Sequence, residues 1–550
     1  TETETETEKG SVGVRVLATM SGGTVKENLA WCWSKRNHVD EIVSEVWSNV
    51  RPGGRLHPAW FFEAKGHLAV ELLLFAVILY LITRKSFKPK KEKPLSKAEQ
   101  EELIEDWVPE PLAPTSYATA SDGDEAATGL RSRKNPPVKK QIRYAKTPVV
   151  KGKASAPHVQ VGSKKVMNLV STNFLNFANS EKIEDACEKA LQRYGCGSCG
   201  PRGFYGTIDV HLEFEDRMAK FLGTEEAILY SYDISTPSSA IPAFCKSGDV
   251  IVADSGVNYA IQSGLTLSRS TVIYFEHNNL KDLERVLQQV TGEDNKKGKT
   301  NLERIQRRFI VVEGIYQNYG DLCPLKGVMA LKEKYNFRMI LEESLALGVL
   351  GKSGRGSVEH HGLEVDQVDI TLASLGNSIG SIGGICAGSR RVCDHQRLSG
   401  AGYVFSASLP PYLACAAIES LNLLEEKGPE LVQALSKKAK VFRDLLGKAF
   451  AKSKSLRVHQ ENDEDVLSPF VHLKLVAKQN SEVEAVEVLQ TFVDAALREG
   501  VFLSLSKYTF LDRFDGCQSI RMAVNVEHTN ADLAKAVGTL KKQAQKLDLL

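Results

Sequence analysis

The sequence has almost no excess charge of either sign. It holds 70 lysines and arginines against 68 aspartates and glutamates in 550 residues. A protein that binds a polyanion carries a clear basic surplus, so this balance argues against nucleic acid as a partner.

Cysteine is also sparse, with ten residues scattered along the chain. So low a density in so long a chain argues against a secreted disulfide framework. One C-x-x-C pair is present, Cys196 and Cys199, but no second pair of ligands lies near it in sequence, so we expect no metal site. We expect most of the cysteines to be reduced and buried.

Long apolar runs are scarce as well. One run stands out, L-L-L-F-A-V-I-L-Y-L-I from Leu72 to Ile82. It is shorter than the roughly 17 to 25 residues that span a bilayer. Counting back over residues 68–70 lengthens it with Glu71 embedded, and the aromatic residues 60–62 fit an interfacial belt. A buried core helix is the alternative interpretation.

The charges that flank this run favour the membrane. Six basic residues lie in 84–93 against three in 51–65, and a basic flank is typical of the cytosolic side. We therefore expect a single membrane helix with its interfacial flank over 58–84. The main body would then face the cytosol, which agrees with reduced cysteines.

Composition divides the chain into five parts. The N-terminal T-E-T-E-T-E-T-E is polar and of low complexity, which predicts a flexible region. Nine of the nineteen prolines lie between 84 and 157, which predicts a linker with one short helix near 95–107. The expected parts are a polar region 1–57, the membrane segment 58–84, a Pro-rich linker 85–164, a large domain 165–430 and a small C-terminal domain 431–550.

From about residue 165, short β-rich runs alternate with amphipathic helical patterns. This alternation predicts an α/β domain with a mainly parallel sheet. After about 430 the helices lengthen and two strand-like runs appear, 470–475 and 519–526, which predicts a smaller α+β domain. The expected strands of the large domain are 227–231, 250–254, 271–275, 309–314 and 339–343.

Six sequence blocks lie in order along residues 165–550. They are Y-G-C-G-S-C-G-P-R-G-F-Y-G-T-I-D-V-H-L-E-F-E (194–215), V-V-E-G-I-Y-Q-N-Y-G-D-L-C-P-L (311–325), L-E-E-S-L-A-L-G (341–348), S-L-G-N-S-I-G-S-I-G-G (374–384), F-S-A-S-L-P-P (405–411) and I-R-M-A-V-N-V-E-H-T (520–529). Together they resemble the α-oxoamine synthases. These are pyridoxal-phosphate enzymes of the aspartate-aminotransferase fold (fold type I) that condense an amino acid with an acyl-CoA. The resemblance implies that fold for the large domain.

The block at 374–384 departs from the family at its central position. The family pattern T-x-x-K-x-x-G-x-x-G-G has a lysine that forms the imine with the cofactor aldehyde, and this chain has Asn377 there. An amide nitrogen is not nucleophilic because its lone pair is delocalised into the carbonyl, so it cannot replace the amine.

Other cofactor positions implied by the resemblance differ too. The aspartate that pairs with the pyridinium nitrogen corresponds to Glu342, and the histidine three residues later corresponds to Leu345. The histidine that stacks on the ring corresponds to Asn258. Asp233 stands on the phosphate side, where it would repel a dianion. We therefore interpret the cofactor pocket as degenerate and this chain as non-catalytic.

A degenerate pocket behind an N-terminal membrane helix is similar to the non-catalytic long-chain-base subunits of serine palmitoyltransferases. The resemblance implies a heterodimer at the endoplasmic reticulum that makes 3-oxosphinganine from L-serine and palmitoyl-CoA at a shared interface, the first step of sphingolipid synthesis. A paralogous catalytic subunit would supply the lysine and hold pyridoxal phosphate. Membrane lipid, a small activating subunit and an Orm-type regulator are the further partners that the resemblance implies.

Five residues are candidates for completing the partner's site. The resemblance implies that Ser406 reaches the neighbour's phosphate, with a turn serine as the alternative. It implies that Arg521 holds an amino-acid carboxylate, a bidentate role suited to guanidinium, with a structural role as the alternative. Cys199, Arg202 and Tyr205 lie in the glycine-rich block, whose glycines permit a flexible loop. Cys199 either faces the partner's pocket or is a buried packing cysteine.

Two other functions remain open from the sequence. The chain could be an active α-oxoamine synthase that uses another lysine, for which Lys352 in G-V-L-G-K-S-G-R-G is the nearest candidate. It could also be a membrane scaffold in which the old pocket has no role.

Overall fold

The computed structural model divides the chain into two units, residues 1–115 and 116–550, which are described separately. The residues it describes are 73–80, 96–105, 148–297, 306–459, 468–476, 482–509, 511–513 and 518–550.

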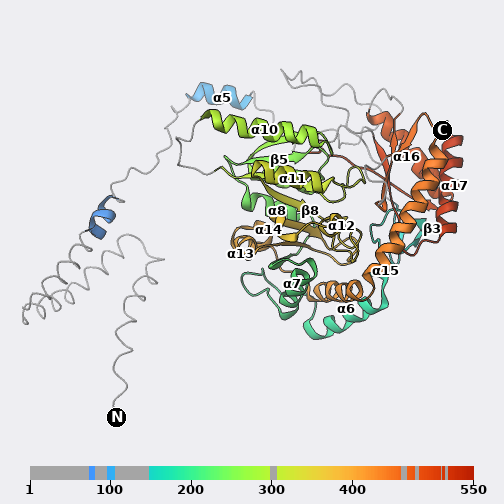
Figure 1. Cartoon of the computed structure of the whole chain (residues 1–550), viewed down its shortest axis with the longest axis horizontal. Helices are drawn as coiled ribbons and strands as arrows, with labels where there is room; N and C mark the ends of the chain where they lie inside the picture. The colour runs from blue at the N-terminus through green and yellow to red at the C-terminus, as the bar shows by residue number, and fades with distance from the viewer. Residues whose placement is uncertain are drawn as a thin grey trace, which may run out of the picture. The chain divides into compact units, whose positions relative to one another are not determined.

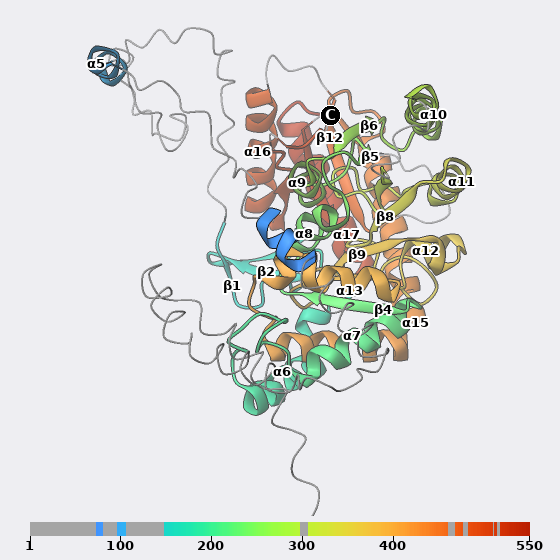
Figure 2. The same cartoon turned by 90° about the vertical axis from the view of Figure 1, so that its left-hand side faces the viewer.

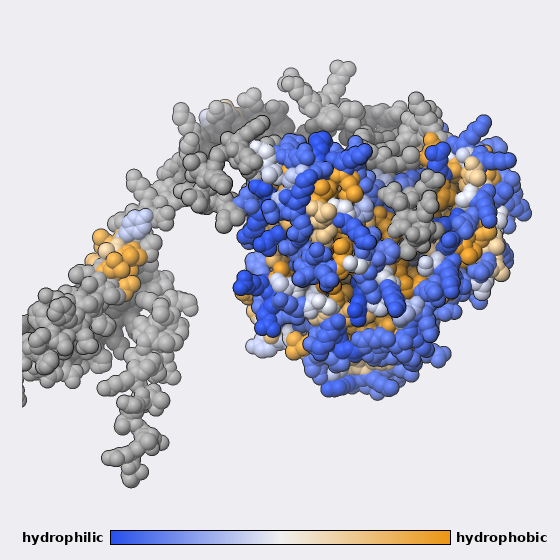
Figure 3. All heavy atoms as spheres, viewed as in Figure 1, coloured by the Kyte–Doolittle hydropathy of each residue, from blue (hydrophilic) through white to orange (hydrophobic). Residues whose placement is uncertain are grey.

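The first unit contributes two described helices. Residues 73–80 form a helix whose apolar side chains are all exposed, and they form the orange cluster at the left of Figure 3. The second helix, α5 (Lys97–Glu105), confirms the short helix expected in the linker. Within the described part of the chain, no helix has the length and apolarity needed to cross a bilayer. The remainder of the expected membrane segment 58–84 and the polar region 1–57 lie outside the described residues.

The second unit is built on a sheet of seven strands in the order β4-β10-β9-β8-β7-β5-β6. Neighbouring strands are parallel except that β10 runs antiparallel to both β4 and β9. The five strands expected from the sequence are confirmed. Two strands, β9 and β10, were not among them, and the short G-I-C-A-G of β10 is bounded by glycines. The bounds are β4 (Glu226–Tyr230), β5 (Val250–Asp254), β6 (Thr271–Phe275), β7 (Arg308–Glu313), β8 (Arg338–Glu342), β9 (Ile370–Ser374) and β10 (Gly384–Gly388).

Helices cover both faces of this sheet because successive strand residues point to opposite sides. In β4, Ile228 packs into one hydrophobic cluster and Leu229 into the other. In Figure 1 α10 lies above β5, and α6 and α7 lie at the opposite end of the body. Figure 2 shows α8 and α9 on one side of β5 and β8, with α10 and α11 on the other. The first cluster involves α8 (Ser235–Phe244), α9 (Tyr259–Ser268), α10 (Leu280–Lys297) and α11 (Leu325–Tyr335), and the second involves α6 (Glu181–Tyr194), α7 (Asp209–Leu222) and α15 (Pro411–Phe450). Three shorter helices are α12 (Ser357–His361), α13 (Arg390–Ser399) and α14 (Ala401–Val404).

A second sheet begins inside the expected linker 85–164. Its order is β1-β2-β3-β13, and β3 pairs in parallel with β13 from far along the chain. Figure 2 shows β1 and β2 at the edge of the body. The last part of the expected linker is therefore structured, because β1 and β2 pair in succession with β3. The bounds are β1 (Val150–Lys151), β2 (His158–Val161), β3 (Lys164–Asn168) and β13 (Val501–Phe502).

The C-terminal part holds an antiparallel sheet in the order β11-β12-β15-β14. Helix α15 crosses the expected boundary between 430 and 431: Leu421 packs in a core of the large sheet and Phe442 in the C-terminal core. The bounds are β11 (Leu456–Val458), β12 (Phe470–Leu475), β14 (Ser504–Leu505), β15 (Ser519–Ala523), α16 (Glu482–Arg498) and α17 (Asn530–Lys546).

A cluster of buried charges joins these parts. His277 bonds Asp254 through Nδ1 at 2.8 Å and Asp321 through Nε2 at 3.1 Å, and His459 Nε2 lies 3.0 Å from Asp321. Burial alone would lower the pKa of His277, but the hydrogen bonds to the two aspartates outweigh it and raise that pKa to about 9. Protonated His277 therefore adds to the free energy of unfolding. This contribution is fully present below the unfolded pKa of 6.5 and is lost as the pH rises through about 9.

We predict that His277→Gln lowers the free energy of unfolding by about 3 kcal/mol near neutral pH, since each pKa unit is worth about 1.36 kcal/mol. The deficit relative to wild type should shrink above about pH 9, where His277 loses its proton. Denaturant unfolding across this pH range measures it, with the more exposed His158→Gln as the control. A deficit that stays constant with pH would contradict the role of the charge.

Candidate functional site

A cavity of about 300 Å³ opens at the carboxyl ends of β7, β8 and β9. Ligands in open α/β sheets commonly bind beyond this edge. Five residues expected in the degenerate cofactor pocket or as partner-site contributors line it, together with Glu313. The lining residues that matter below are Asn258, Glu313, Glu342, Leu345, Asn377 and Arg521.

Asn377 lies in the turn after β9 and connects two other segments. Its Nδ2 donates to the carbonyl of Ser344 at 2.8 Å, and its Oδ1 accepts from the Thr172 hydroxyl at 2.6 Å. The turn is tight, because Gly380 has φ +69° and a Cβ there would lie 2.5 Å from the backbone nitrogen of Ala178. The side-chain amide is thus fixed in place on both sides.

Asp233 acts on the same turn. Its Oδ1 accepts from the backbone N–H of Gly383 at 2.9 Å, and a Cβ on Gly376 would lie 2.5 Å from its Oδ2. Burial raises the pKa of Asp233. This carboxylate therefore occupies the space beside the turn backbone.

Asn258 is the N-cap of α9. Its Oδ1 accepts from the backbone nitrogens of Ala260 and Ile261 at 2.9 and 3.2 Å. Its own backbone N–H donates to Glu313 Oε1 at 2.6 Å. Since asparagine is among the strongest N-cap residues, the side chain is committed to the helix end.

Two carboxylates form an acidic wall at the ends of β7 and β8. Glu313 accepts from the backbone N–H groups of Asn258 and Gln317, and Glu342 accepts through Oε1 from the N–H and hydroxyl of Ser344. Burial raises the pKa of Glu342 to about 7. Burial and the nearby Glu342 raise the pKa of Glu313 well above its usual value.

Sequence reasoning missed Glu313. The signal was present, because this glutamate ends a predicted strand, 309–314, in the block V-V-E-G. Carboxyl ends of neighbouring parallel strands meet at one edge, which brings Glu313 to Glu342.

Arg521 faces the cavity from β15 in the C-terminal sheet. Its Nε is buried and has no hydrogen-bond partner. Burial lowers the pKa of Arg521. Leu345 completes the apolar part of the lining and is itself buried.

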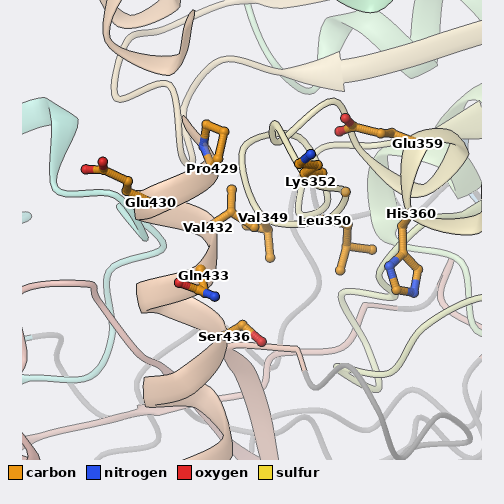
Figure 4. A pocket seen from close by; sticks show the side chains of 11 residues that line it. Val349, Leu350, Lys352, Glu359, His360, Pro429, Glu430, Val432, Gln433 and Ser436 are labelled. Carbon is orange, nitrogen blue, oxygen red and sulfur yellow. The ribbon is translucent and has the colours of Figure 1, made fainter. Parts of the chain in front are cut away.

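No lysine is among the described residues that line this cavity. Lys352 lines another cavity of about 580 Å³, between the segment 348–356 and α15. Figure 4 shows Lys352 with Glu359, Pro429 and Val432. The Glu359 carboxylate accepts from the backbone N–H groups of Ser353 and Arg355. The loop's amides are therefore already used within the chain.

The loop of the glycine-rich block 194–215 is tied to the segment around Ser408 by hydrogen bonds. Ser408 donates its backbone N–H to the carbonyl of Gly200 at 2.9 Å and its hydroxyl to that of Gly206 at 2.6 Å. A Cβ on Gly206 would lie 1.8 Å from the Gly200 oxygen, so glycine serves close packing there. Pro201 also forms an isolated β-bridge with Ala407.

The candidate partner-site residues of this block, and Ser406 near it in the fold, differ in their exposure and in their contacts. Arg202 is buried and makes a two-pronged ion pair with Glu215 at 2.8 and 2.9 Å, so its guanidinium is used inside the chain. Cys199 is exposed with φ +59°, which corrects the alternative of a buried packing cysteine. Tyr205 is 92% exposed. The Ser406 hydroxyl donates to the carbonyl of Gly402, as a turn serine would.

The expectation that most cysteines are buried is wrong for the C-x-x-C pair. Cys196 and Cys199 are both exposed and free. Four other described cysteines are buried: Cys245, Cys323, Cys386 and Cys393.

Exposed apolar side chains gather around this loop. The bridge between Pro201 and Ala407 and the hydrogen bond from Ser231 to the Ala407 carbonyl bring three segments together. The hydrogen bond from the backbone N–H of Gly383 to Asp233 joins the segment around Gly383 to these three. So many exposed apolar groups on connected segments indicate an interaction surface. We call this set the apolar rim; it comprises Phe204, Tyr205, Tyr232, Ile234, Ile382 and Phe405.

Comparisons with known proteins agree with this architecture. The family model described as aminotransferase class I and II matches residues 164–540. Long chain base biosynthesis protein 1c of Oryza sativa subsp. japonica is 47% identical over 480 residues, which cover 87% of this chain and 91% of the relative. Serine palmitoyltransferase 1 of Dictyostelium discoideum is 39% identical over 479 residues, with 86% and 93% covered.

A solved structure of SPT with a PLP internal aldimine is similar in fold. Its TM-score is 0.63 at 23% identity, covering 74% of this chain and 94% of that one. The expected aspartate-aminotransferase-like α/β fold is thus confirmed, with mixed sheets. By the extent of the family match and the identity to these relatives, the chain belongs to the aminotransferase class I and II family and, within it, to the group of long chain base biosynthesis protein 1 and serine palmitoyltransferase 1.

Proposed function

We propose that the chain is a catalytically silent but required subunit of a heterodimeric serine palmitoyltransferase. That enzyme joins L-serine to palmitoyl-CoA and releases 3-oxosphinganine, carbon dioxide and CoA. The names of the relatives support the enzyme. The cavity described above supports the silence of this chain.

The observation that carries the proposal is the bonded amide of Asn377. A pyridoxal-phosphate enzyme needs a primary amine to bind the cofactor aldehyde. Here both polar atoms of the side chain are engaged, with Ser344 and Thr172. The amide is neither nucleophilic nor free to move toward a ligand.

The surrounding residues do not fit the cofactor either. The half-buried carboxylate of Asp233 beside the turn would repel a dianionic phosphate. Asn258 is committed to capping α9, and the apolar Leu345 offers no hydrogen bond. These features support a partner that carries pyridoxal phosphate on its own lysine.

A paralogous catalytic subunit is the partner that we propose, with L-serine and palmitoyl-CoA bound at the shared interface. The apolar rim supports such a partner because its side chains are left uncovered in this chain. Phe405 is 81% exposed and Tyr205 is 92% exposed. Cys199 lies on the same loop and would border the shared site.

We further propose that segment 58–84 anchors the complex in the endoplasmic reticulum membrane as a single pass, with the main body in the cytosol. The exposed apolar helix 73–80 supports contact with lipid. The proposal of a small activating subunit and an Orm-type regulator as further partners is based on the family resemblance.

Asn377→Lys should not create an active enzyme in the purified chain. The lysine would supply an amine, but Asp233, Asn258 and Leu345 would remain. The test is 3-oxosphinganine formation and aldimine absorbance, measured for the chain alone and with the catalytic partner. We expect colour and turnover only with the partner; turnover by the variant alone would refute the proposal.

Phe405→Asp should weaken copurification with the catalytic partner by at least about tenfold, because a charge would be buried against an apolar surface. Leu267→Asp is the matched control, since Leu267 is 60% exposed near the C-terminal end of α9 and is not one of the rim residues. Equal losses for the two variants would argue against the rim as the interface.

Cys199→Trp should leave the complex assembled but lower turnover or change the choice of amino acid, because an exposed large ring on this loop would enter the shared site. Cys199→Ser is the small control and should be mild. Copurification and product analysis on both variants measure it. Loss of assembly, or unchanged products, would remove the loop from the site.

A further inference from the structure

A cavity of about 420 Å³ lies between the sheet β1-β2-β3-β13 and helix α17. Its lining comes from β2, β3, β13, the end of α16 and the first half of α17. Residues of β3, α16 and α17 also share the C-terminal hydrophobic core, and Figure 1 shows these three elements together. The cavity shares no lining residue with the one at the carboxyl ends of β7, β8 and β9. It is therefore a separate candidate site, built on regular elements.

The turn after α16 brings basic residues from distant parts of the chain together. Helix α16 ends at Arg498, and Gly500, with φ +93°, turns the chain into β13. Strand β13 pairs in parallel with β3, with Val501 opposite Met167. This register places Arg498 beside the start of β3, where Lys164 Nζ donates to the Arg498 carbonyl at 3.0 Å. The positions of these two residues are therefore fixed by the backbone.

The lining of this cavity is rich in unpaired positive charge. Four cationic side chains contribute to it, and among the residues that the structure describes none of the four forms an ion pair. Like charges that gather around a hollow raise the local potential and attract anions. The four residues are Lys164, Lys165, Arg498 and Lys535.

The two carboxylates of the lining do not balance this charge. Asp532 accepts the backbone N–H and the hydroxyl of Thr529 at the N-cap of α17, and its Oδ1 lies 3.7 Å from His158 Nε2. Glu499 is the other carboxylate. With His158 neutral, the lining therefore carries an excess of two positive charges. A ligand with two negative charges matches this excess.

We propose that this cavity binds a phosphate monoester, with the phosphate oxygens on Arg498 and the lysines. A phosphate monoester carries nearly two negative charges at neutral pH and offers three strong acceptor oxygens. Guanidinium and ammonium groups are the side chains that bind such oxygens. The cavity also has room for the group attached to the phosphate, whose hydroxyls can bond Glu499 and Thr539. This inference does not depend on the proposed function.

Calorimetric titration of the purified full-length chain in detergent with glycerol 3-phosphate tests the proposal. We expect saturable binding at one site, which weakens as salt is raised because the basic side chains are exposed. Glycerol lacks the phosphate and should give no saturable heat. Glycerate carries one negative charge and should bind at least about threefold more weakly. Glycerate binding as tightly as glycerol 3-phosphate would overturn the proposal.

The phosphate monoester can come from a soluble molecule or from a lipid headgroup, and a second titration separates the two. Dihexanoyl phosphatidic acid has the glycerol 3-phosphate headgroup on two short acyl chains, and dihexanoyl phosphatidylcholine is the control for the chains. An affinity for the phosphatidic acid at least about tenfold above that for glycerol 3-phosphate assigns the site to a lipid. Equal affinities assign it to a soluble ester. No saturable binding of either phosphate monoester would overturn the proposal, as would phosphatidylcholine binding equally well.

Variants place the ligand in this cavity. Arg498→Gln and Lys535→Gln should each weaken glycerol 3-phosphate binding by about threefold to tenfold. Lys541→Gln removes the same charge from an exposed position of α17 outside the cavity and should leave binding unchanged. Equal losses for all three variants would mean that only the overall charge matters and would overturn the proposal. The comparison of ligands on the wild-type chain does not depend on the folding of any variant.

Discussion

The side-chain amide of Asn377 ties the edge of the central sheet to two loops. It holds the turn after β9 against Ser344, which follows β8, and against Thr172, which follows β3. Ser344 in turn accepts the backbone N–H of Ser374 at 2.7 Å and donates to Glu342. This chain of hydrogen bonds fixes the part of the cavity lined by Thr172, Ser344 and Glu342. Asn258 and Glu313 are joined by a separate hydrogen bond.

Such a network suits an amide better than an amine. An amide both donates and accepts, whereas a protonated lysine only donates. A lysine at 377 would therefore lose the bond to Thr172 as an acceptor and would place a charge beside the carbonyl of Ser344. The hydrogen-bonding groups around position 377 are thus matched by an asparagine side chain.

Local pattern predicted much of the fold. The apolar runs that became β5 and β6 are short, β-rich and bounded by turns, so their positions follow from sequence alone. The glycine spacing likewise located the turn at Asn377. The partners of that turn could not be read in the same way, because Thr172 lies 205 residues away in sequence. The ion pair of Arg202 with Glu215 was missed for a similar reason, since it depends on how the loop folds back onto α7.

Helix α15 has a mechanical consequence. It is 40 residues long and packs in the cores of both the central and the C-terminal sheets. The C-terminal sheet, which carries Arg521, can therefore move against the strand ends that carry Glu342 only if the helix bends or travels as a rod. Gly428 and Pro429 stand at its middle, and proline removes a backbone hydrogen bond. A helix bends most easily at such a point, so any movement of the C-terminal sheet relative to the strand ends would concentrate its bending at Gly428 and Pro429.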